Sequence, residues 1–582
     1  METQNNCGIA GDDYRAGRFC NAKHKENHLE KETPRSSSEI PANASGSHTE
    51  FNPGDVIMSS FPWTYTILPE LMEKLCYRCL KSLPILLSTA EFDLSLTCPT
   101  CNVPVYCSEK CRTEDWMEPV GDEVSIAPHS HLKMPVEITG SASSCLIGRH
   151  QQECNALLQA SYDRKAALDL PVDFFLMMGA IKKLGRKEPA DRFGQCIPPT
   201  TRTFDSLLCH SEEFALSEDR MLYVDLLKEK LQPCLSAAEM PNDREFLRIF
   251  GCLQINCFGI RSPFLIGVGE GLYLGPSVID HSCEKNAVFL FQGTQILIKA
   301  IAPIASLSEA RISYTELFVP MGVRNRRFKN GYYFECSCRL CCDEKLFADF
   351  YPMKCATSTC TAAIPLDQRS LLNCLDCNHP AASEESLAAA RLFVRRYLEG
   401  IEEMDDRIKL PEWDMPDIVA DFRNVERRAE KILHPTNLLL GMILDRHARL
   451  VGSLGDNEKA FDYFRKSLPA FRIFFKPFDT KLAVQILMTG LSAYLAGAYR
   501  EACAFLREAS EKLIISDGAG RPLVDASLIL LGVSSVENST QPVVDLKFTF
   551  LAKTLLSLLT NIRIERLSHI YEQQVQVLLA SS

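Results

Sequence analysis

The chain has 582 residues, more than one hydrophobic core can organise, so we expect several domains. Its net charge of −11 argues against a general nucleic-acid binder, whose affinity comes from basic surface. The polar residues 1–13 give no sign of a signal peptide, and no apolar run is long enough to span a bilayer. We therefore expect an intracellular protein without a membrane segment.

Cysteine is more frequent than packing alone requires, with 25 residues that cluster at short spacings. In a secreted chain such clusters would indicate disulfides. In a chain without a leader they are better explained as metal thiolates.

The N-terminal region combines a polar segment with a strand signal. Residues 24–50 are rich in Ser, Glu and Pro, which is typical of a flexible insertion. Ordered sequence is expected from Phe51, where FNPGDVIMSSFPWTYTIL joins a turn signal to strand-like residues.

The first cysteine cluster occupies residues 76–154, and residues 117–148 interrupt it as a predicted surface loop. Its candidate ligands form four close pairs, a pattern that suits two tetrahedral zinc ions. These ligands are Cys76, Cys79, Cys98, Cys101, Cys107, Cys111, His150 and Cys154. Inside the loop, His129, His131 and Cys145 are rival ligands.

The middle of the chain changes from a helical to a strand-like pattern. Residues 155–250 contain amphipathic runs such as EFALSEDRMLYVDLLKEKL, which predict helices. Residues 251–335 contain short apolar segments broken by Gly and Pro, which predict strands. A second cysteine cluster follows at 336–342 and a third at 355–377.

Beyond about residue 384 the pattern is helical. In GLSAYLAGAYREACAFLREA, small residues are expected where paired helices pack closely, namely Gly490, Gly497, Ala502 and Ala509. This spacing of small residues favours a tetratricopeptide-like (TPR-like) repeat over an ordinary helical bundle.

Three motifs indicate a known family. VYCSEKC and HQQEC, with the preceding cysteine pairs, resemble the MYND zinc finger. YLGPSVIDHSCEKN, then RISYTEL, then RNRRFKNGYYFECSCRLCC resemble the SET domain. In this order the motifs resemble the SET and MYND domain protein-lysine methyltransferases over nearly all of the chain outside its two long inserts.

The resemblance implies an α+β fold, with a SET-type β core, an inserted MYND finger and helical insert, and an all-α TPR-like C-terminal domain. The expected divisions are the start of the SET domain at 1–75, the finger at 76–154, the helical insert at 155–250, the SET core at 251–335, the post-SET zinc tail at 336–345, a small zinc ribbon or linker at 346–383, and the helical domain at 384–582.

The resemblance also implies how the metal ligands combine. Cys76, Cys79, Cys107 and Cys111 would hold one zinc, and Cys98, Cys101, His150 and Cys154 another. A third zinc would join Cys283 to Cys336, Cys338 and Cys341, with Cys342 as a less favoured substitute. Spacing alone suggests a fourth set, a small zinc ribbon or else free thiols, at Cys355, Cys360, Cys374 and Cys377.

The implied reaction transfers a methyl group from S-adenosylmethionine to a neutral lysine amine. It needs a desolvated amine, linear alignment and oxygen acceptors around the methyl group. By resemblance, Tyr314 is the catalytic tyrosine and also lies near the cofactor, while Tyr332 lines the lysine channel. The implied cofactor-binding residues are Ala16, Gly17, Arg18, Asn256, Asp280, His281, Tyr314 and Phe334.

Two positions depart from the family pattern. Phe19 replaces the second glycine of the Gly-x-Gly turn, where a side chain can obstruct close approach to the cofactor. Asp280 stands where the family commonly has Asn, and its carboxylate can only accept hydrogen bonds. The basic run of Arg324, Arg326 and Arg327 is interpreted as a solvated face.

The preferred function is therefore a zinc-containing lysine methyltransferase that acts on a histone or another protein. The alternative is a scaffold of weak or no activity that recruits proline-rich or helical partners. A DNA-binding zinc protein is disfavoured by the acidic charge. The resemblance also implies a monomer in the cytoplasm and nucleus, with a proline-rich peptide as a partner of the finger.

Overall fold

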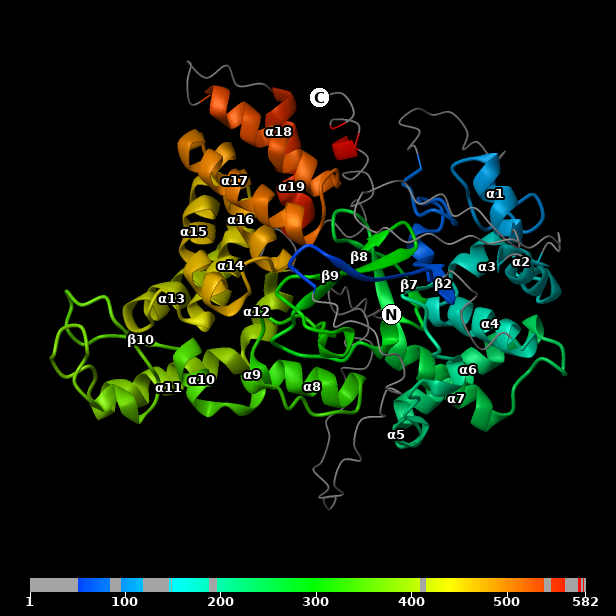
Figure 1. The fold of residues 1–582 in the computed structure, drawn as a ribbon, viewed down its shortest axis with the longest axis horizontal. Coiled ribbons are helices and arrows are strands. Elements are labelled where there is room, and N and C mark those ends of the chain that lie inside the picture. The colour runs from blue at the N-terminus through cyan, green and yellow to red at the C-terminus, as the bar shows by residue number, and fades with distance from the viewer. Residues whose placement is uncertain are drawn as a thin grey trace.

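The computed structural model describes residues 51–83, 96–118, 146–147, 149–187, 196–408, 415–537, 546–560, 574–576 and 579. Small antiparallel sheets occupy the middle of the molecule (Figure 1). The helices of the N-terminal half lie on one side of them, and the C-terminal helices lie on the other. Among the described helices, none is both long and apolar enough to cross a membrane.

Two sheets form the β core. One has the order β5-β1-β9-β8 and the other β2-β7-β6, all antiparallel. The strands are β1 (Val56–Ser60), β2 (Thr64–Ile67), β5 (Cys196–Ile197), β6 (Cys257–Arg261), β7 (Gly267–Leu272), β8 (Ala287–Gln292) and β9 (Gln295–Ala300). The turn predicted after Phe51 is present, because Asn52 donates its backbone N–H to Asp55 Oδ2 at 2.8 Å and β1 follows.

A group of helices begins at the end of the finger and continues after it, as the periodicity predicts. They are α2 (Arg149–Gln159), α3 (Arg164–Leu168), α4 (Val172–Gly185), α5 (Ser211–Ala215), α6 (Glu218–Leu231) and α7 (Asp243–Asn256). Helix α4 packs on β2 so closely that a side chain at Gly179 would meet Thr64 Oγ1 at 2.5 Å. The strand prediction for 251–335 is right for β6 to β9 and wrong at its ends, where α7 continues to Asn256 and α8 spans Met321–Gly331.

The C-terminal part is built from consecutive helices that pack on their neighbours in chain order (Figure 1). They are α11 (Glu384–Glu399), α12 (Ile401–Ile408), α13 (Met415–Ile432), α14 (Leu438–Ser453), α15 (Asn457–Phe474), α16 (Thr480–Leu495), α17 (Tyr499–Ser516), α18 (Pro522–Glu537) and α19 (Leu546–Thr560). Two of these helices have an aspartate as N-cap: Asp456 and Asp479 accept hydrogen bonds from backbone N–H groups in the first turns of α15 and α16.

The small residues of α16 and α17 have two different roles. A Cβ at Gly490 would lie 3.0 Å from Leu506 Cγ, so glycine permits close packing there. Ala502 and Ala509 of α17 are also fully buried. The prediction that Gly497 takes part in this contact is wrong: among the described residues no atom lies within 4 Å of its Cβ position, and its φ of 75° makes the turn between the helices.

The C-terminal helices are tied to the β core beside the DHSC motif. Lys285 pairs with the buried Asp479 at 3.2 Å, and Lys481 pairs with Glu316 at 2.6 Å. Phe318 packs against Phe471, with ring centroids 3.9 Å apart. These contacts fix the helical part against both segments that carry the SET-like motifs.

Candidate functional site

An aromatic cluster forms where the two SET-like segments meet. The ring of His281 lies 5.4 Å from that of Tyr314 and 6.0 Å from that of Phe334. Tyr314 lies 6.4 Å from Phe334 and 5.2 Å from Tyr332. The structure thus brings four of the predicted site residues together from positions far apart in the sequence.

Hydrogen bonds hold Tyr314 in this cluster. Its backbone N–H donates to His281 Nδ1 at 3.1 Å, so a neutral His281 carries its proton on Nε2. The Tyr314 hydroxyl donates to the backbone carbonyl of Ile279 at 2.8 Å. The Tyr332 hydroxyl donates to the carbonyl of Tyr314 at 3.2 Å. Because the Tyr314 O–H direction is fixed, its oxygen keeps its acceptor capacity for another group.

The environment of Tyr314 keeps its hydroxyl protonated. Burial raises the pKa of Tyr314 well above its ordinary value, and the nearby charge of Asp280 raises it further. The positive charge of Arg202 acts in the opposite direction but does not cancel the effect of burial. Tyr314 is therefore a neutral hydrogen-bonding group at physiological pH and cannot serve as a base there.

Of the other predicted cofactor residues, Asn256 has hydrogen-bond partners within the protein, and the N-terminal candidates lie outside the described residues. Asn256 ends helix α7, and its Nδ2 donates to the carbonyls of Leu208 at 2.9 Å and Cys252 at 2.8 Å. These bonds anchor its side chain to α7 and to the segment before α5. Ala16, Gly17, Arg18 and Phe19 lie outside the described residues, as do the rival ligands His129, His131 and Cys145.

Sequence reasoning missed Phe328, which completes the cluster from helix α8. This ring is fully buried, stacks on Phe334 at 5.1 Å and lies 4.4 Å from His281. Phe328 is the large apolar residue in the otherwise polar run RNRRFKN. A single apolar residue among charged ones was the sequence signal that could have indicated its burial.

The two adjacent tyrosines face different ways. Tyr333 has a φ of 57°, a left-handed conformation that is uncommon outside glycine. Its ring stacks on His210 at 5.2 Å and packs against Phe214 of α5, while Tyr332 and Phe334 contact the His281 cluster. The turn at Tyr333 therefore places alternate aromatic rings on separate surfaces.

The interpretation of the basic run as a solvated face is wrong for Arg324. Its side chain is buried, and its Nη1 donates to the carbonyls of Leu317 at 3.0 Å and Val319 at 2.7 Å. The guanidinium thus satisfies carbonyls that the irregular chain before α8 leaves without helix partners. Arg326 fits the prediction better, since it is exposed and pairs with Glu402.

In the described part of the chain, the cysteine clusters form four sets, each with its ligand atoms within 4.8 Å of one another. The first three sets contain Cys76, Cys79, Cys107 and Cys111; Cys98, Cys101, His150 and Cys154; and Cys283, Cys336, Cys338 and Cys341. Four thiolates 2.3 Å from one zinc would be separated by about 3.8 Å. The Cys79–Cys107, Cys98–Cys154 and Cys283–Cys336 sulfurs are 3.6, 3.8 and 4.0 Å apart. Cys342 is exposed and belongs to none of these sets.

The finger presents its ligands from two helices and two tight turns. Cys111 lies on α1 (Glu109–Trp116), and His150 and Cys154 lie on α2. After Cys79 and Cys101 the chain turns at Leu80 and Asn102, whose φ angles are 60° and 56°. The two ends of the predicted loop form the short strands β3 (Met117–Glu118) and β4 (Leu146–Ile147), which pair with each other.

A buried arginine, also missed in the sequence, supports the finger. Arg149 lies over the rings of Tyr65 and Tyr77, 4.0 and 4.1 Å from their centroids. It pairs with the buried carboxylates of Asp115 at 3.3 Å and Glu153 at 3.9 Å. Because Tyr65 lies on β2 and Asp115 on α1, this one side chain joins the finger to the β core.

Replacing Arg149 with methionine is expected to lower the free energy of unfolding by about 3–5 kcal/mol, because the two buried carboxylates lose their cation. Denaturant unfolding measures the loss. Lys110→Met is the matched control: Lys110 is 81% exposed and 3.8 Å from Glu114, so it should cost less than about 1 kcal/mol. Equal losses in the two variants would contradict the assigned role of Arg149.

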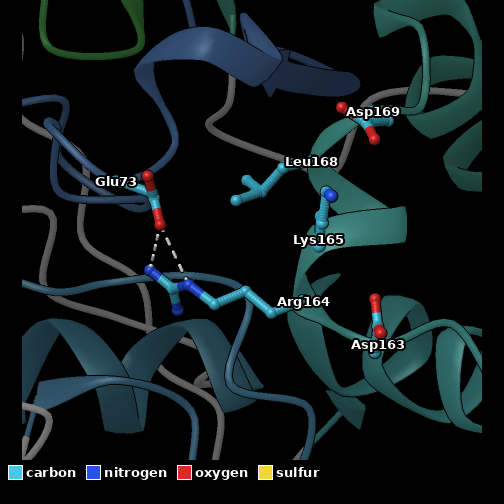
Figure 2. Close-up of a pocket in the computed structure, with 6 residues that line it drawn as sticks. All are labelled: Glu73, Asp163, Arg164, Lys165, Leu168 and Asp169. Atoms are coloured by element: carbon cyan, nitrogen blue, oxygen red, sulfur yellow. Dashed lines mark hydrogen bonds and ion pairs between the residues drawn. The ribbon is translucent and has the colours of Figure 1, made fainter.

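The pocket in Figure 2 lies where α3 meets the finger. Its lining is mostly charged and consists of Glu73, Asp163, Arg164, Lys165, Leu168 and Asp169. Arg164 donates to Glu73 Oε1 from Nε and Nη2, at 2.9 and 2.8 Å. Asp163 accepts the backbone N–H of Ala166 as the N-cap of α3. Arg164 and Glu73 therefore dock α3, and Asp163 caps it, so these pocket residues have structural roles.

The ligand sets and the aromatic cluster define a class of protein that has cysteine and histidine sets suited to a metal in a finger, and a further cysteine set beside an aromatic site. Comparison with known proteins agrees, because residues 76–119 match the MYND finger family. The chain is 21% identical over 480 residues to histone-lysine N-methyltransferase SMYD3 of Mus musculus, covering 82% of this chain and 92% of that protein.

Other relatives have similar names. Histone-lysine N-methyltransferase ASHR1 of Arabidopsis thaliana is 21% identical over 496 residues, covering 82% of this chain and 89% of its own. N-lysine methyltransferase SMYD2 of Gallus gallus is 29% identical over 103 residues, or 18% of this chain and 24% of its own. The chain therefore carries a MYND zinc finger and is a homologue, over most of its length, of the SET and MYND domain methyltransferases.

Proposed function

We propose that the protein is a SET-type, S-adenosylmethionine-dependent protein-lysine N-methyltransferase that acts on a histone or another protein. The observation that carries the proposal is the convergence of residues 280–283 and 314–341. These segments form one aromatic cluster directly beside one cysteine set.

The residues around Tyr314 suit a zwitterionic methyl donor. The charges of Asp280 and Arg202 are close enough to Tyr314 to shift its pKa, Asp280 upward and Arg202 downward. Within the described part of the chain, the buried Nε of Arg202 has no hydrogen-bond partner. An arginine and an aspartate can pair with the carboxylate and the ammonium of an amino acid, and Phe334 offers a face for a purine. S-adenosylmethionine would supply an electrophilic methyl group there.

The protein residues would then act by positioning and desolvation. Tyr314 holds its oxygen in a fixed direction and can accept weak C–H hydrogen bonds from a polarised methyl group. The ring of Tyr332, 5.2 Å from that of Tyr314, would form a wall beside the lysine. A lysine amine buried among these rings loses its proton more readily, because desolvation lowers its pKa.

The first three ligand sets would each hold zinc. Their sulfur separations fit a tetrahedral ion, and thiolate with histidine is the donor chemistry that zinc prefers. Zinc at Cys283 would fasten the tail that bears Tyr332 and Phe334 to the DHSC segment that bears His281. Metal binding in such sites supplies folding free energy.

The test uses purified full-length protein with radiolabelled S-adenosylmethionine and a panel of histones and cell extract. Label on protein lysines, together with cofactor binding by calorimetry, is the expected result. Binding without transfer would mean that the panel lacks the substrate. If the zinc-loaded protein shows no cofactor binding and no methyl transfer, the proposal is overturned in favour of the scaffold.

A further inference from the structure

The fourth cysteine set lies outside the matched finger and outside the aromatic site. Cys355, Cys360, Cys374 and Cys377 bring their sulfur atoms within 4.8 Å of one another. Cys355 and Cys377 are 3.8 Å apart, and Cys360 and Cys374 are 3.7 Å apart. Four thiolates around one zinc would be about 3.8 Å apart. A disulfide requires sulfurs at about 2.05 Å, so these separations fit a shared ion better.

The backbone of this set repeats a turn of the MYND finger. Asn378 has a φ of 56° and donates its N–H to the carbonyl of Cys374 at 2.8 Å. Cys374 in turn donates its N–H to the carbonyl of His379 at 2.8 Å. In residues 76–81, Leu80 has a φ of 60° and donates to Cys76 at 3.0 Å, and Cys76 donates to Lys81 at 2.8 Å. The two Cys-x-x-Cys segments therefore share the same backbone turn.

The surrounding ribbon docks on the junction between α13 and α14. It contains the paired strands β10 (Met353–Lys354) and β11 (Ala363–Ile364). Met353 forms a β-bridge with Leu433, directly after α13. The buried side chain of Asn437 donates to the carbonyl of Pro352 at 2.8 Å and also accepts N–H groups from the first turn of α14.

A histidine adds a second bond at this junction. The backbone N–H of His434 donates to the carbonyl of Pro352 at 3.1 Å. Its ring Nε2 lies 3.0 Å from the carbonyl of Thr361, which can only accept, so Nε2 is the donor. His434 thus contacts the chain at Pro352, before Cys355 in the sequence, and at Thr361, after it. The position of the α13–α14 junction therefore depends on a ribbon with little regular structure of its own.

From these observations we propose that Cys355, Cys360, Cys374 and Cys377 hold a fourth, structural zinc ion that clamps the ribbon onto the α13–α14 junction. All four positions carry thiolates, which leaves no open coordination site for catalysis. The ion compensates for the few buried contacts of so short a segment, as in other small metal-stabilised folds. This inference does not depend on the proposed methyl transfer.

The test compares metal content in the full chain, measured by native mass spectrometry and elemental analysis. The double variant Cys374→Ser, Cys377→Ser should contain one zinc ion fewer than the wild type. Cys503→Ser, on α17 and in none of the four sets, is the control and should keep the wild-type content. Equal zinc content in the wild type and the double variant would overturn the inference.

A second measurement tests the clamp. Amide hydrogen exchange at residues 433–441 should be at least about tenfold faster in the double variant, because the junction opens locally without the ribbon. Unchanged exchange would refute the clamping role even if the zinc is lost. If the double variant does not fold, the wild-type metal content decides: four zinc ions support the site, and three or fewer refute it.

Discussion

Replacing Tyr314 with phenylalanine is expected to reduce the rate of methyl transfer on the order of 10²-fold, the scale seen when one preorganised polar group is removed from an active site. The aromatic ring and its contacts with His281 and Tyr332 remain, so folding should be little affected. The lost atom is the hydroxyl oxygen, which the carbonyl of Ile279 holds in one direction. Single-turnover kinetics with saturating cofactor separates this loss from a loss of binding.

Tyr333→Phe is the matched control. Tyr333 is adjacent to Tyr332, but its ring packs against His210 and Phe214 on the other surface. Removal of its hydroxyl should leave methyl transfer within about twofold of the wild type, because no transition-state contact is lost. A similar loss in both variants would show that Tyr314 acts only through packing.

The pH dependence distinguishes positioning from proton transfer. Because burial raises the pKa of Tyr314, its hydroxyl stays protonated at every pH below its usual titration range. The rate should therefore rise with pH only as the substrate lysine loses its proton. The Tyr314→Phe variant should show the same profile at a lower level. A wild-type inflection that disappears in the variant would instead identify Tyr314 as a base.

Replacing Cys283 with serine is expected to remove one zinc ion and to weaken binding of S-adenosylmethionine at least about tenfold, as expected when the support of a site is lost. Cys283 is buried, and its sulfur lies 3.6 Å from that of Cys341 and 4.0 Å from that of Cys336. Serine does not ionise to a thiolate, so the DHSC segment and the tail lose their common ion. Phe334, two residues before Cys336, is then no longer held against His281.

Cys342→Ser provides the control for this prediction. Cys342 is adjacent to Cys341 but is exposed and belongs to none of the four sets, so its replacement should leave zinc content and cofactor affinity unchanged. Calorimetry and elemental analysis measure both quantities. Retention of zinc by Cys283→Ser, or its loss from Cys342→Ser, would contradict the proposed ligand set.

Local spacing predicted the close pairs of metal ligands, because both members of a pair lie within a few residues of each other in the chain. The association of Cys283 with Cys336 joins distant segments, and only the resemblance to a known family suggested it. Arg149 and Arg324 were not predicted, because sequence reveals a positive charge but not the buried carboxylates or unpaired carbonyls that receive it. Phe328 was missed for a similar reason, since its basic surroundings suggested a solvated face.

The pairing of β3 with β4 has a consequence for how the finger tolerates added sequence. Met117 lies opposite Ile147, so the chain departs and returns at neighbouring points between two of the ligand pairs. Closing a longer connection across such a fixed gap costs little, only about 0.6 kcal/mol for each doubling of its length. This position is therefore a natural place to graft a reporter peptide without disturbing either coordination sphere.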